Sequence, residues 1–403
     1  MMQTSDAERE AADRLLGQVE EALGAPVAPP WVAAFRETPR TAFLPDRVWV
    51  GDGLEEISRR ADPKAWLEAA YADGPVVTQV NDGRAVEAGE ELWPSCSASA
   101  PSVVFRMLGL LDVQDGQRIC EVGTGTGWNA ALLARRVGAD RVTTIEVDPG
   151  LSEEARVRLA RAGVAPRVVC GDGAEGDAAG APYDRWESTC SVRRVPSAWL
   201  EQTRPGGVIV TPWDSAWFTY GLLRLVVGED GDACGRFLPY SAFMGRREER
   251  TDLRIYRDVV RDEHVPAESR TDLSPWSVAG DGQWDIRFTL GLLLPDLWST
   301  WHHDPDVDGV KVRLWVASTD AASWAAVDWD GTSDEMFTVW QHGAGGRRVW
   351  DEVESAYRWW VSNRSPGPDR YGMSLAAGGR RTVWLDRPGN PVPASRAWPP
   401  AKR

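Results

Sequence analysis

The sequence contains few cysteines, few histidines and no long apolar run. Its five cysteines are widely spaced and form no CxxC pair, which excludes a disulfide framework and favours reduced thiols in a cytoplasmic protein. No stretch approaches the ~20 apolar residues of a membrane helix, and the first 24 residues lack the apolar core of a signal peptide. His302-His303-Asp304 matches no standard ligand spacing, so we expect no bound metal.

Basic residues are also fewer than acidic residues. Lys and Arg number 45 against 60 Asp and Glu, a formal net charge of −15, and no basic run is longer than the pair Arg246-Arg247. Because a surface this acidic repels phosphate backbones, we expect no nucleic-acid partner. The hydrophobic content of 43% is ordinary for a chain with buried cores, and 403 residues suggest two or three domains.

Tryptophan is the residue in excess. The chain has 22 Trp against 7 Tyr and 8 Phe, and 15 of the 22 follow residue 205. This bias marks a second region with a composition of its own, in which most Trp are expected to pack in the core. We predict an N-terminal helical segment (residues 1–98), a central domain (residues 99–245) and a Trp-rich α+β accessory domain (residues 246–403).

The central region alternates short apolar strands with amphipathic helices. Strands are predicted at 118–122, 142–146, 167–170, 184–189 and 208–211, with helices at 129–137, 151–162 and 196–202. This alternation predicts an α/β fold with a doubly wound, Rossmann-like parallel sheet. Outside it we predict helices after Ser5, at 63–71 and after Pro101, a strand at 75–80 and a hairpin at 220–227 and 236–243. Beyond the hairpin we expect mainly short strands, among them 310–315, 337–340 and 381–385.

A glycine-rich turn follows the first strand of that sheet. Glu121-Val-Gly123-Thr124-Gly125-Thr-Gly127 stands between a strand and a helix, where a nucleotide-binding loop belongs. Glu146 ends the next strand, 19 residues after Gly127, where a carboxylate can accept both ribose hydroxyls. Asp172-Gly173, after the third strand, would reach an adenine edge, or is a solvated turn.

Two cofactor classes fit this turn. A dinucleotide site has the spacing G-x-G-x-x-G, whereas the sequence has G-x-G-x-G preceded by Glu121. An acidic residue at this strand tip suits the ammonium group of an amino-acid end. The pattern therefore favours S-adenosyl-L-methionine, with a dinucleotide as the alternative.

Taken in order, the motifs resemble the protein-L-isoaspartate O-methyltransferase family. Those that carry the resemblance are Ser97-Ala-Ser99-Ala-Pro101, the glycine loop, Gly171-Asp-Gly173, Pro182-Tyr-Asp184 and Arg204-Pro-Gly-Gly-Val208. The likeness spans roughly residues 15–245, about 57% of the chain. It implies a methyltransferase fold, S-adenosyl-L-methionine as cofactor, Ser99 as the active-site serine, Glu146 on ribose, and Asp172 and Gly173 on adenine. Ser97 and Ser99 can also be interpreted as caps of the following helix.

The sequence departs from the family pattern at several places. Trp128 replaces a Tyr or Leu, and Cys190-Ser-Val-Arg193-Arg194 replaces a small apolar stretch. Arg193 and Arg194 favour an anionic peptide substrate, with Ser97 beside it, or else are surface residues. The chain also continues for about 155 residues beyond the end of ordinary family members.

With this extension the chain is similar to variants associated with ribosomally made peptides, in graspetide and lanthipeptide pathways. The segment 370–390 is similar to their C-terminal tail. The resemblance implies methylation of one Asp side chain in an ATP-grasp-cyclised precursor peptide, followed by closure of the ester to an aspartimide. The N-terminal segment is then expected to cover the substrate and the accessory domain to bind peptide.

Two other functions stay open. One is general repair of isoaspartate in proteins, and the other is a non-catalytic scaffold that binds cofactor or peptide. All four histidines follow residue 260, which argues against a Ser/His/Asp hydrolase in the central domain. A carboxylate is already ionised at pH 7, so attack on a methyl group needs no general base.

Overall fold

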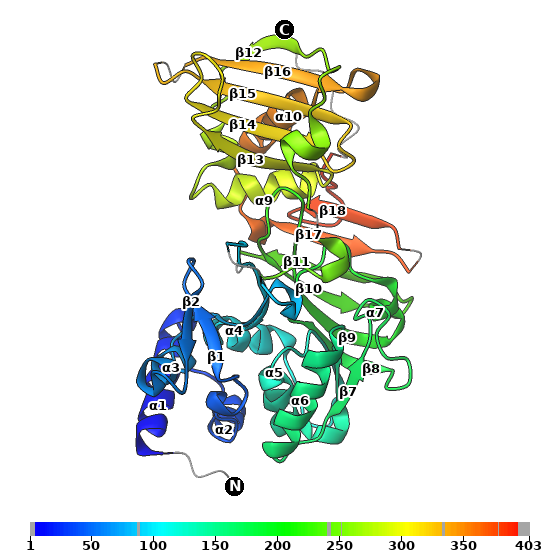
Figure 1. Cartoon of the computed structure of the whole chain (residues 1–403). Helices are drawn as coiled ribbons and strands as arrows, with labels where there is room; N and C mark the ends of the chain where they lie inside the picture. Colours follow the sequence, from blue (N-terminus) through cyan, green and yellow to red (C-terminus); the bar gives the residue numbers. More distant parts are fainter. Residues whose placement is uncertain are drawn as a thin grey trace.

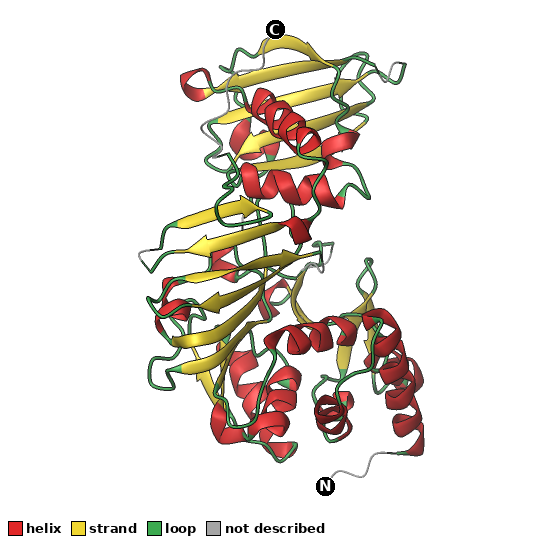
Figure 2. Cartoon of the chain, turned by 180° about the vertical axis from the view of Figure 1, so that it is seen from behind, coloured by secondary structure: helices red, strands yellow, loops and turns green. Residues whose placement is uncertain are grey.

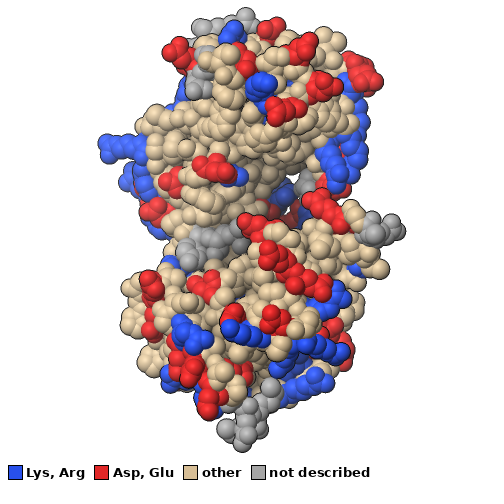
Figure 3. All heavy atoms as spheres, turned by 60° about the vertical axis from the view of Figure 1, so that its left-hand side comes forward, with Lys and Arg blue, Asp and Glu red and all other residues tan. Residues whose placement is uncertain are grey.

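The computed structural model describes residues 5–86, 89–239, 243–250, 252–332, 335–377 and 379–393. Figure 1 shows an elongated molecule in which the N-terminal segment and the central sheet lie at one end and a second sheet lies at the other. On the face drawn in Figure 3, acidic and basic side chains intermingle over the surface. Within the described ranges, no helix is both long enough and apolar enough to cross a membrane.

The N-terminal segment combines helices with a small sheet. Its helices are α1 (Asp6–Leu23), α2 (Pro29–Arg36) and α3 (Pro63–Ala70). The Ser5 hydroxyl accepts the Glu8 N–H at 3.2 Å, and Gly24 ends α1 with φ of 68°, so the predicted first helix is confirmed.

A four-stranded antiparallel sheet accompanies these helices, in the order β2-β1-β3-β4. Its strands are β1 (Arg47–Val50), β2 (Glu55–Ser58), β3 (Val76–Val80) and β4 (Pro94–Ala98). Only β3 was predicted. Strand β3 contains three Val in five residues, whereas β2 and β4 have no such apolar content and β1 is only four residues long.

The central sheet has nine strands in the order β18-β17-β11-β10-β9-β8-β5-β6-β7. The parallel strands are β5 (Ile119–Val122), β6 (Val142–Glu146), β7 (Arg167–Cys170), β8 (Tyr183–Ser188) and β9 (Thr203–Pro212). Both β6 and β8 pair with β5, so the winding direction reverses at β5, and a crevice forms at the strand ends there. The predicted doubly wound, Rossmann-like sheet is confirmed.

Helices lie on both faces of this sheet, as Figure 2 shows from behind. They are α4 (Pro101–Leu111), α5 (Trp128–Val137), α6 (Pro149–Arg161) and α7 (Ser197–Glu201). Their apolar residues bury the sheet, with Leu108, Ala131 and Leu132 fully inaccessible. The site at the strand ends therefore stands on a rigid base.

Antiparallel strands extend the central sheet. They are β10 (Leu222–Val227), β11 (Ala233–Leu238), β17 (Tyr371–Leu375) and β18 (Arg381–Leu385). The predicted hairpin forms, with its second strand earlier than expected, and residues 240–242 of that prediction lie outside the described residues. Because β17 pairs with β11, the sheet runs across the predicted boundary at 245/246. The division into 1–98, 99–245 and 246–403 stays a prediction.

The C-terminal region forms a five-stranded antiparallel sheet in the order β12-β16-β15-β14-β13. Its strands are β12 (Ala267–Thr271), β13 (Leu297–His303), β14 (Val312–Ser318), β15 (Ser323–Trp329) and β16 (Phe337–Gly343). The helices are α8 (Trp276–Ala279), α9 (Trp284–Leu293) and α10 (Val349–Ser362). The α+β class is confirmed, but the expectation of mainly strands missed α9 and α10.

Candidate active site at the strand ends

A cavity of about 470 Å³ opens at the C-terminal ends of β5 and β6. The loops after β5, β6 and β7, the turn between β4 and α4, and the segment around residues 243–250 form its walls. It brings together most of the residues singled out in the sequence. Those that line it are Ser97, Ser99, Gly123, Gly125, Glu146, Asp172 and Gly173.

The glycine loop needs its glycines for two reasons. Gly123, Gly125 and Gly127 have φ values of 93°, 51° and 90°, a region that other residues rarely adopt. A Cβ on Gly123 would also lie 2.6 Å from Thr189 Oγ1. Gly127 is the N-cap of α5 and faces Leu159 rather than the cavity. The loop therefore presents bare backbone to whatever the cavity holds.

Glu146 lies at the end of β6 with its carboxylate at the cavity wall. It accepts the N–H of Gly125 at 2.8 Å and that of Asp148 at 3.1 Å. Burial raises the pKa of Glu146, while these two N–H groups and the Arg247 charge act in the opposite direction. The carboxylate is thus held in one orientation, and hydroxyl groups of a ligand can donate to it.

The side chains of Glu121 and Thr124 are buried, and neither residue lines the cavity. One amide bridges two buried carboxylates there: Asn129 Nδ2 donates to Glu121 Oε1 at 2.8 Å and to Glu187 Oε2 at 2.9 Å. The Thr144 hydroxyl donates to Glu121, and the Thr124 hydroxyl contacts that of Thr144 at 2.6 Å. Glu121 therefore supports the loop, and its predicted contact with a ligand stays a prediction.

Burial is the main cause of the raised pKa values of the two carboxylates, Glu121 and Glu187. It raises the pKa of Glu121 to about 8, with the Glu187 charge adding to the shift, and raises the pKa of Glu187 to about 7. Sequence reasoning missed Glu187. The only signal was a single carboxylate in the otherwise buried second half of strand β8.

Ser97 and Ser99 reach the cavity from the N-terminal sheet and the turn that follows it. Ser97 lies on β4, opposite Val77 of β3, and Ser99 lies just before α4. The N-cap of α4 is Ala100, and the first-turn N–H of Ser102 donates to the Asp73 carboxylate at 2.8 Å rather than to either serine. The alternative interpretation of these serines as helix caps is therefore wrong.

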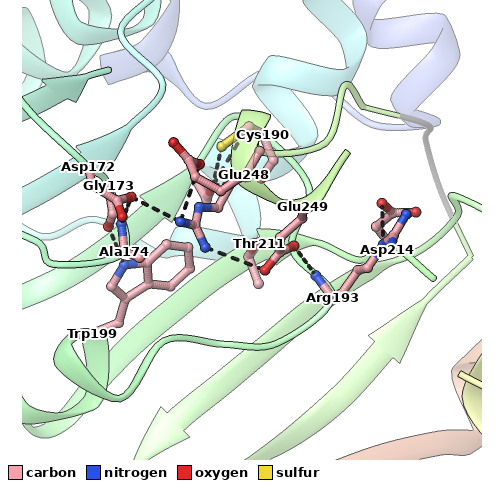
Figure 4. A network of polar contacts seen from close by, with 12 residues as sticks. Asp172, Gly173, Ala174, Cys190, Arg193, Trp199, Thr211, Asp214, Glu248 and Glu249 are labelled. Carbon is pink, nitrogen blue, oxygen red and sulfur yellow. Dashed lines mark hydrogen bonds and ion pairs between the residues drawn. The ribbon is translucent and has the colours of Figure 1, made fainter. Parts of the chain in front are cut away.

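The structure does not bring Arg193 and Arg194 into the cavity lining. The Arg193 guanidinium lies 3.4 Å from the Asp214 carboxylate, and its backbone N–H donates to Glu249 at 2.7 Å (Figure 4). Arg194 is exposed. Their predicted role in substrate binding stays a prediction.

Sequence reasoning also missed a chain segment that crosses the cavity. Arg246 and Arg247 line it, and each pairs with an acid at a strand end: Arg246 with Asp172 at 2.9 Å and Arg247 with Asp148 at 3.0 Å. The dense charge of this stretch was visible in the sequence, but it was interpreted as a domain boundary.

Histidines, which could act as general bases or metal ligands, lie outside the cavity. None of the four histidines is among the residues that line the cavity, and three of them belong to strands of the C-terminal sheet. Among the described residues there is no group of three or more His, Cys, Asp or Glu suited to a metal ion. The cavity offers backbone groups, hydroxyls, thiols, carboxylates and guanidinium groups.

Comparison with known proteins gives a consistent match for the first half of the chain. A family model described as "Protein-L-isoaspartate(D-aspartate) O-methyltransferase (PCMT)" matches residues 45–220. The protein-L-isoaspartate O-methyltransferase of Pyrococcus horikoshii is 42% identical over 134 residues, 33% of this chain and 60% of the relative. That of Methanococcus maripaludis is 38% identical over 181 residues, 44% of this chain and 79% of the relative.

A solved structure shares the fold over nearly the whole chain. It is that of a protein-L-isoaspartate O-methyltransferase, and it superposes with a TM-score of 0.52 at 19% identity. The superposition covers 93% of this chain and 100% of the other. The similarity of fold therefore extends into the C-terminal region.

Proposed function

Since the chain belongs to the protein-L-isoaspartate(D-aspartate) O-methyltransferase family, we propose that it is an S-adenosyl-L-methionine-dependent carboxyl O-methyltransferase acting on proteins or peptides. One observation carries the proposal. A single cavity unites the glycine loop, Glu146 and Asp172 with the hydroxyls of Ser97 and Ser99. The residues proposed to bind the cofactor thus face the same cavity as the serines proposed to contact the substrate.

The residues present fit this cofactor. The cavity, at about 470 Å³, lies within the ~300–1,000 Å³ range of small-molecule sites. A Cβ on Gly123, Gly125 or Gly173 would press against a residue of the cavity wall, namely Thr189, Cys96 and Val122 respectively. Glycine at these three positions therefore keeps the wall in its present shape. Glu146 would hold the ribose hydroxyls, and Asp172 with Gly173 the adenine edge.

The bound cofactor supplies a methyl group carried on a positively charged sulfur. A substrate carboxylate is already ionised near pH 7, so no side chain has to remove a proton first. The residues of the cavity have to align and desolvate the carboxylate. Ser99 can donate a hydrogen bond that orients it. Full alignment of carboxylate, methyl group and sulfur can contribute ~7–11 kcal/mol to catalysis.

The finer proposal concerns the substrate. It is an Asp side chain in a ribosomally made precursor peptide that an ATP-grasp ligase has cyclised. After methylation, the next backbone nitrogen attacks the ester carbonyl, methanol leaves, and a five-membered aspartimide closes. The arginine-containing loop after β8 and the Trp-rich C-terminal region, both departures from the ordinary family pattern, support this substrate.

General repair of isoaspartate is the second candidate. The observation that favours it is the 42% and 38% identity to two relatives that are protein-L-isoaspartate O-methyltransferases. The fold shared with a solved structure also extends into the C-terminal region, so this region alone is no proof of a peptide-tailoring role. A non-catalytic scaffold is the third candidate.

Two experiments separate these functions. The protein is incubated with an isoaspartyl hexapeptide and with a cyclised precursor, and mass spectrometry follows the gain of one methyl group. Rapid turnover of the linear hexapeptide alone would refute the precursor proposal and leave repair. If Ser99→Ala and Gly125→Val both leave product formation in cells intact, the protein is a scaffold.

A further inference from the structure

Residues 246–250 form what is called here the arginine strap, because they cross the rim of the cavity. Arg246, Arg247, Glu248 and Arg250 all line it. The side chain of Arg246 is 11% exposed and that of Arg247 26% exposed. Two neighbouring arginines are thus largely withdrawn from solvent at the edge of the proposed cofactor site.

Arg246 fixes one oxygen of Asp172. Its Nη2 lies 2.9 Å from Asp172 Oδ1, and the same Oδ1 accepts the backbone N–H of Ala174 at 2.8 Å. Figure 4 shows Asp172, Gly173 and Ala174 side by side at this point. Within the described ranges, Asp172 Oδ2 accepts no hydrogen bond. Both contacts therefore orient the carboxylate and leave its second oxygen for a ligand.

Two carboxylates on the strap also contact the Arg246 guanidinium. Glu248 lies 3.5 Å from Nη2, and Glu249 lies 3.4 Å from Nη1. Glu249 also accepts the backbone N–H of Arg193. A guanidinium surrounded by three carboxylates is already neutralised, so it is poorly suited to capture an anionic substrate and well suited to position Asp172.

Arg247 makes the corresponding contact at the ribose end. Its Nη2 lies 3.0 Å from Asp148 Oδ2, and the Asp148 N–H donates to Glu146. Its Nε lies 3.2 Å from Asp82 in the N-terminal segment, which Arg250 also contacts at 3.0 Å. The strap thus fastens the N-terminal cover to the strand ends of the central sheet.

We propose that Arg246 is a positioning residue for adenine recognition: it turns Asp172 so that Oδ2 accepts the exocyclic amino group of the cofactor. Arg247 acts separately, through Asp148, on the ribose end. Both statements rest on the proposed function, since they require the nucleoside to bind in this cavity. They extend it by assigning adenine specificity to a residue that does not contact the base itself.

Calorimetry with two ligands tests the proposal. S-adenosylhomocysteine carries the amino group, and S-inosylhomocysteine carries a carbonyl oxygen in its place. A hydrogen bond to a charged group corresponds to a preference of roughly 10- to 100-fold for the first ligand in the unaltered protein. Arg246→Ala is expected to reduce this preference to within about threefold, and Arg246→Lys to restore most of it.

Two matched variants show that the effect is specific. Arg247→Ala is expected to weaken both ligands equally, because it acts at the ribose end. Arg257→Ala removes an arginine that pairs with Asp252 and Asp258 and does not line the cavity, so it is expected to change neither affinity.

The outcomes separate the two proposals. A folded Arg246→Ala protein that keeps the full preference for the amino ligand overturns the positioning role. If that variant does not fold, Asp172→Ala serves instead, and retention of the preference there overturns the role as well. Failure of the unaltered protein to bind either ligand would contradict the proposed function itself.

Discussion

The guanidinium of Arg40 donates a hydrogen bond to the main-chain carbonyl of Ser99 at 2.9 Å. The same group donates to the carbonyls of Ala98 at 3.0 Å and Ala70 at 3.1 Å, and it lies 5.3 Å from the centre of the Trp128 ring. Arg40 is fully buried, and this burial lowers its pKa to about 10. One buried cation therefore ties the N-terminal helices to the turn that carries the proposed active-site serine.

Replacement of Arg40 by Met is expected to destabilise the protein by about 2–4 kcal/mol, because several buried carbonyls lose their donor. Urea unfolding measures the change, and methyl transfer by the remaining folded protein should fall as the Ser99 turn loosens. Arg36→Met is the control, because Arg36 forms an exposed pair with Asp13 and should change stability by less than ~0.5 kcal/mol. Equal effects of the two variants would show that Arg40 has no special structural role.

Replacement of Glu146 by Ala is expected to weaken S-adenosylhomocysteine binding by roughly 10- to 100-fold, because the ribose hydroxyls lose a charged acceptor. Isothermal titration calorimetry gives the dissociation constant. Glu153→Ala, in the exposed part of α6, should leave it unchanged. Undiminished binding by the Glu146 variant would mean that the nucleoside does not contact the end of β6.

Replacement of Gly123 by Ala combines two penalties, a positive φ and a Cβ 2.6 Å from Thr189 Oγ1. Gly206→Ala carries only the first, since its φ is +77° and nothing lies within 4 Å of the added Cβ. The Gly206 variant should lose ~1 kcal/mol of stability and bind cofactor normally. The Gly123 variant should lose more stability and bind cofactor weakly. A pair of variants with the same melting temperature and the same affinity would refute the close packing of the loop.

The buried carboxylate pair predicts how stability changes with pH. Burial raises the pKa of Glu187 to about 7 in the folded protein, whereas the unfolded chain ionises this group near ~4.3. Between these values the folded state binds more protons than the unfolded state, so the free energy of unfolding falls as pH rises. At a pH below both values the contribution vanishes.

Glu187→Gln stays neutral at every pH, and its Oε1 can still accept from Asn129. The variant should differ from the parent by no more than about 0.6 kcal/mol at pH 4.5, just above the unfolded-state pKa, and exceed its free energy of unfolding at pH 8 by about 1–3 kcal/mol. Urea titrations at the two pH values measure this difference. Glu153→Gln, at an exposed position, should show no such dependence. A Glu187 variant with the same stability difference from the parent at both pH values would refute a raised pKa.

The sequence was most informative where local chemistry decides the structure. The glycine loop and Asp172 come after short strands and Glu146 ends one, and parallel topology brings strand ends together without further information. Their convergence on one cavity was therefore predictable. The role of Ser99 came from a family resemblance, and that of Asp172 from its place after the third strand together with the same resemblance. Both are still predictions.

Contacts between residues far apart in the chain could not be predicted from the sequence. Arg250 pairs with Asp82, 168 residues earlier, and β17 pairs with β11 after more than 130 intervening residues. No periodicity in the sequence encodes such pairings. Glu187 was missed for a different reason. Strand β8 also contains Asp184 and Arg185, so nothing in the sequence distinguishes Glu187 until its partner Asn129 is placed beside it.

A crystal structure of the protein grown with S-adenosylhomocysteine would test the proposed site most directly. We expect the nucleoside between Gly125, Glu146 and Asp172, with its ribose on the Glu146 carboxylate and its adenine beside Asp172. Density for the nucleoside at any other place, or its absence at saturating concentration, would contradict the proposed site and with it the proposed activity.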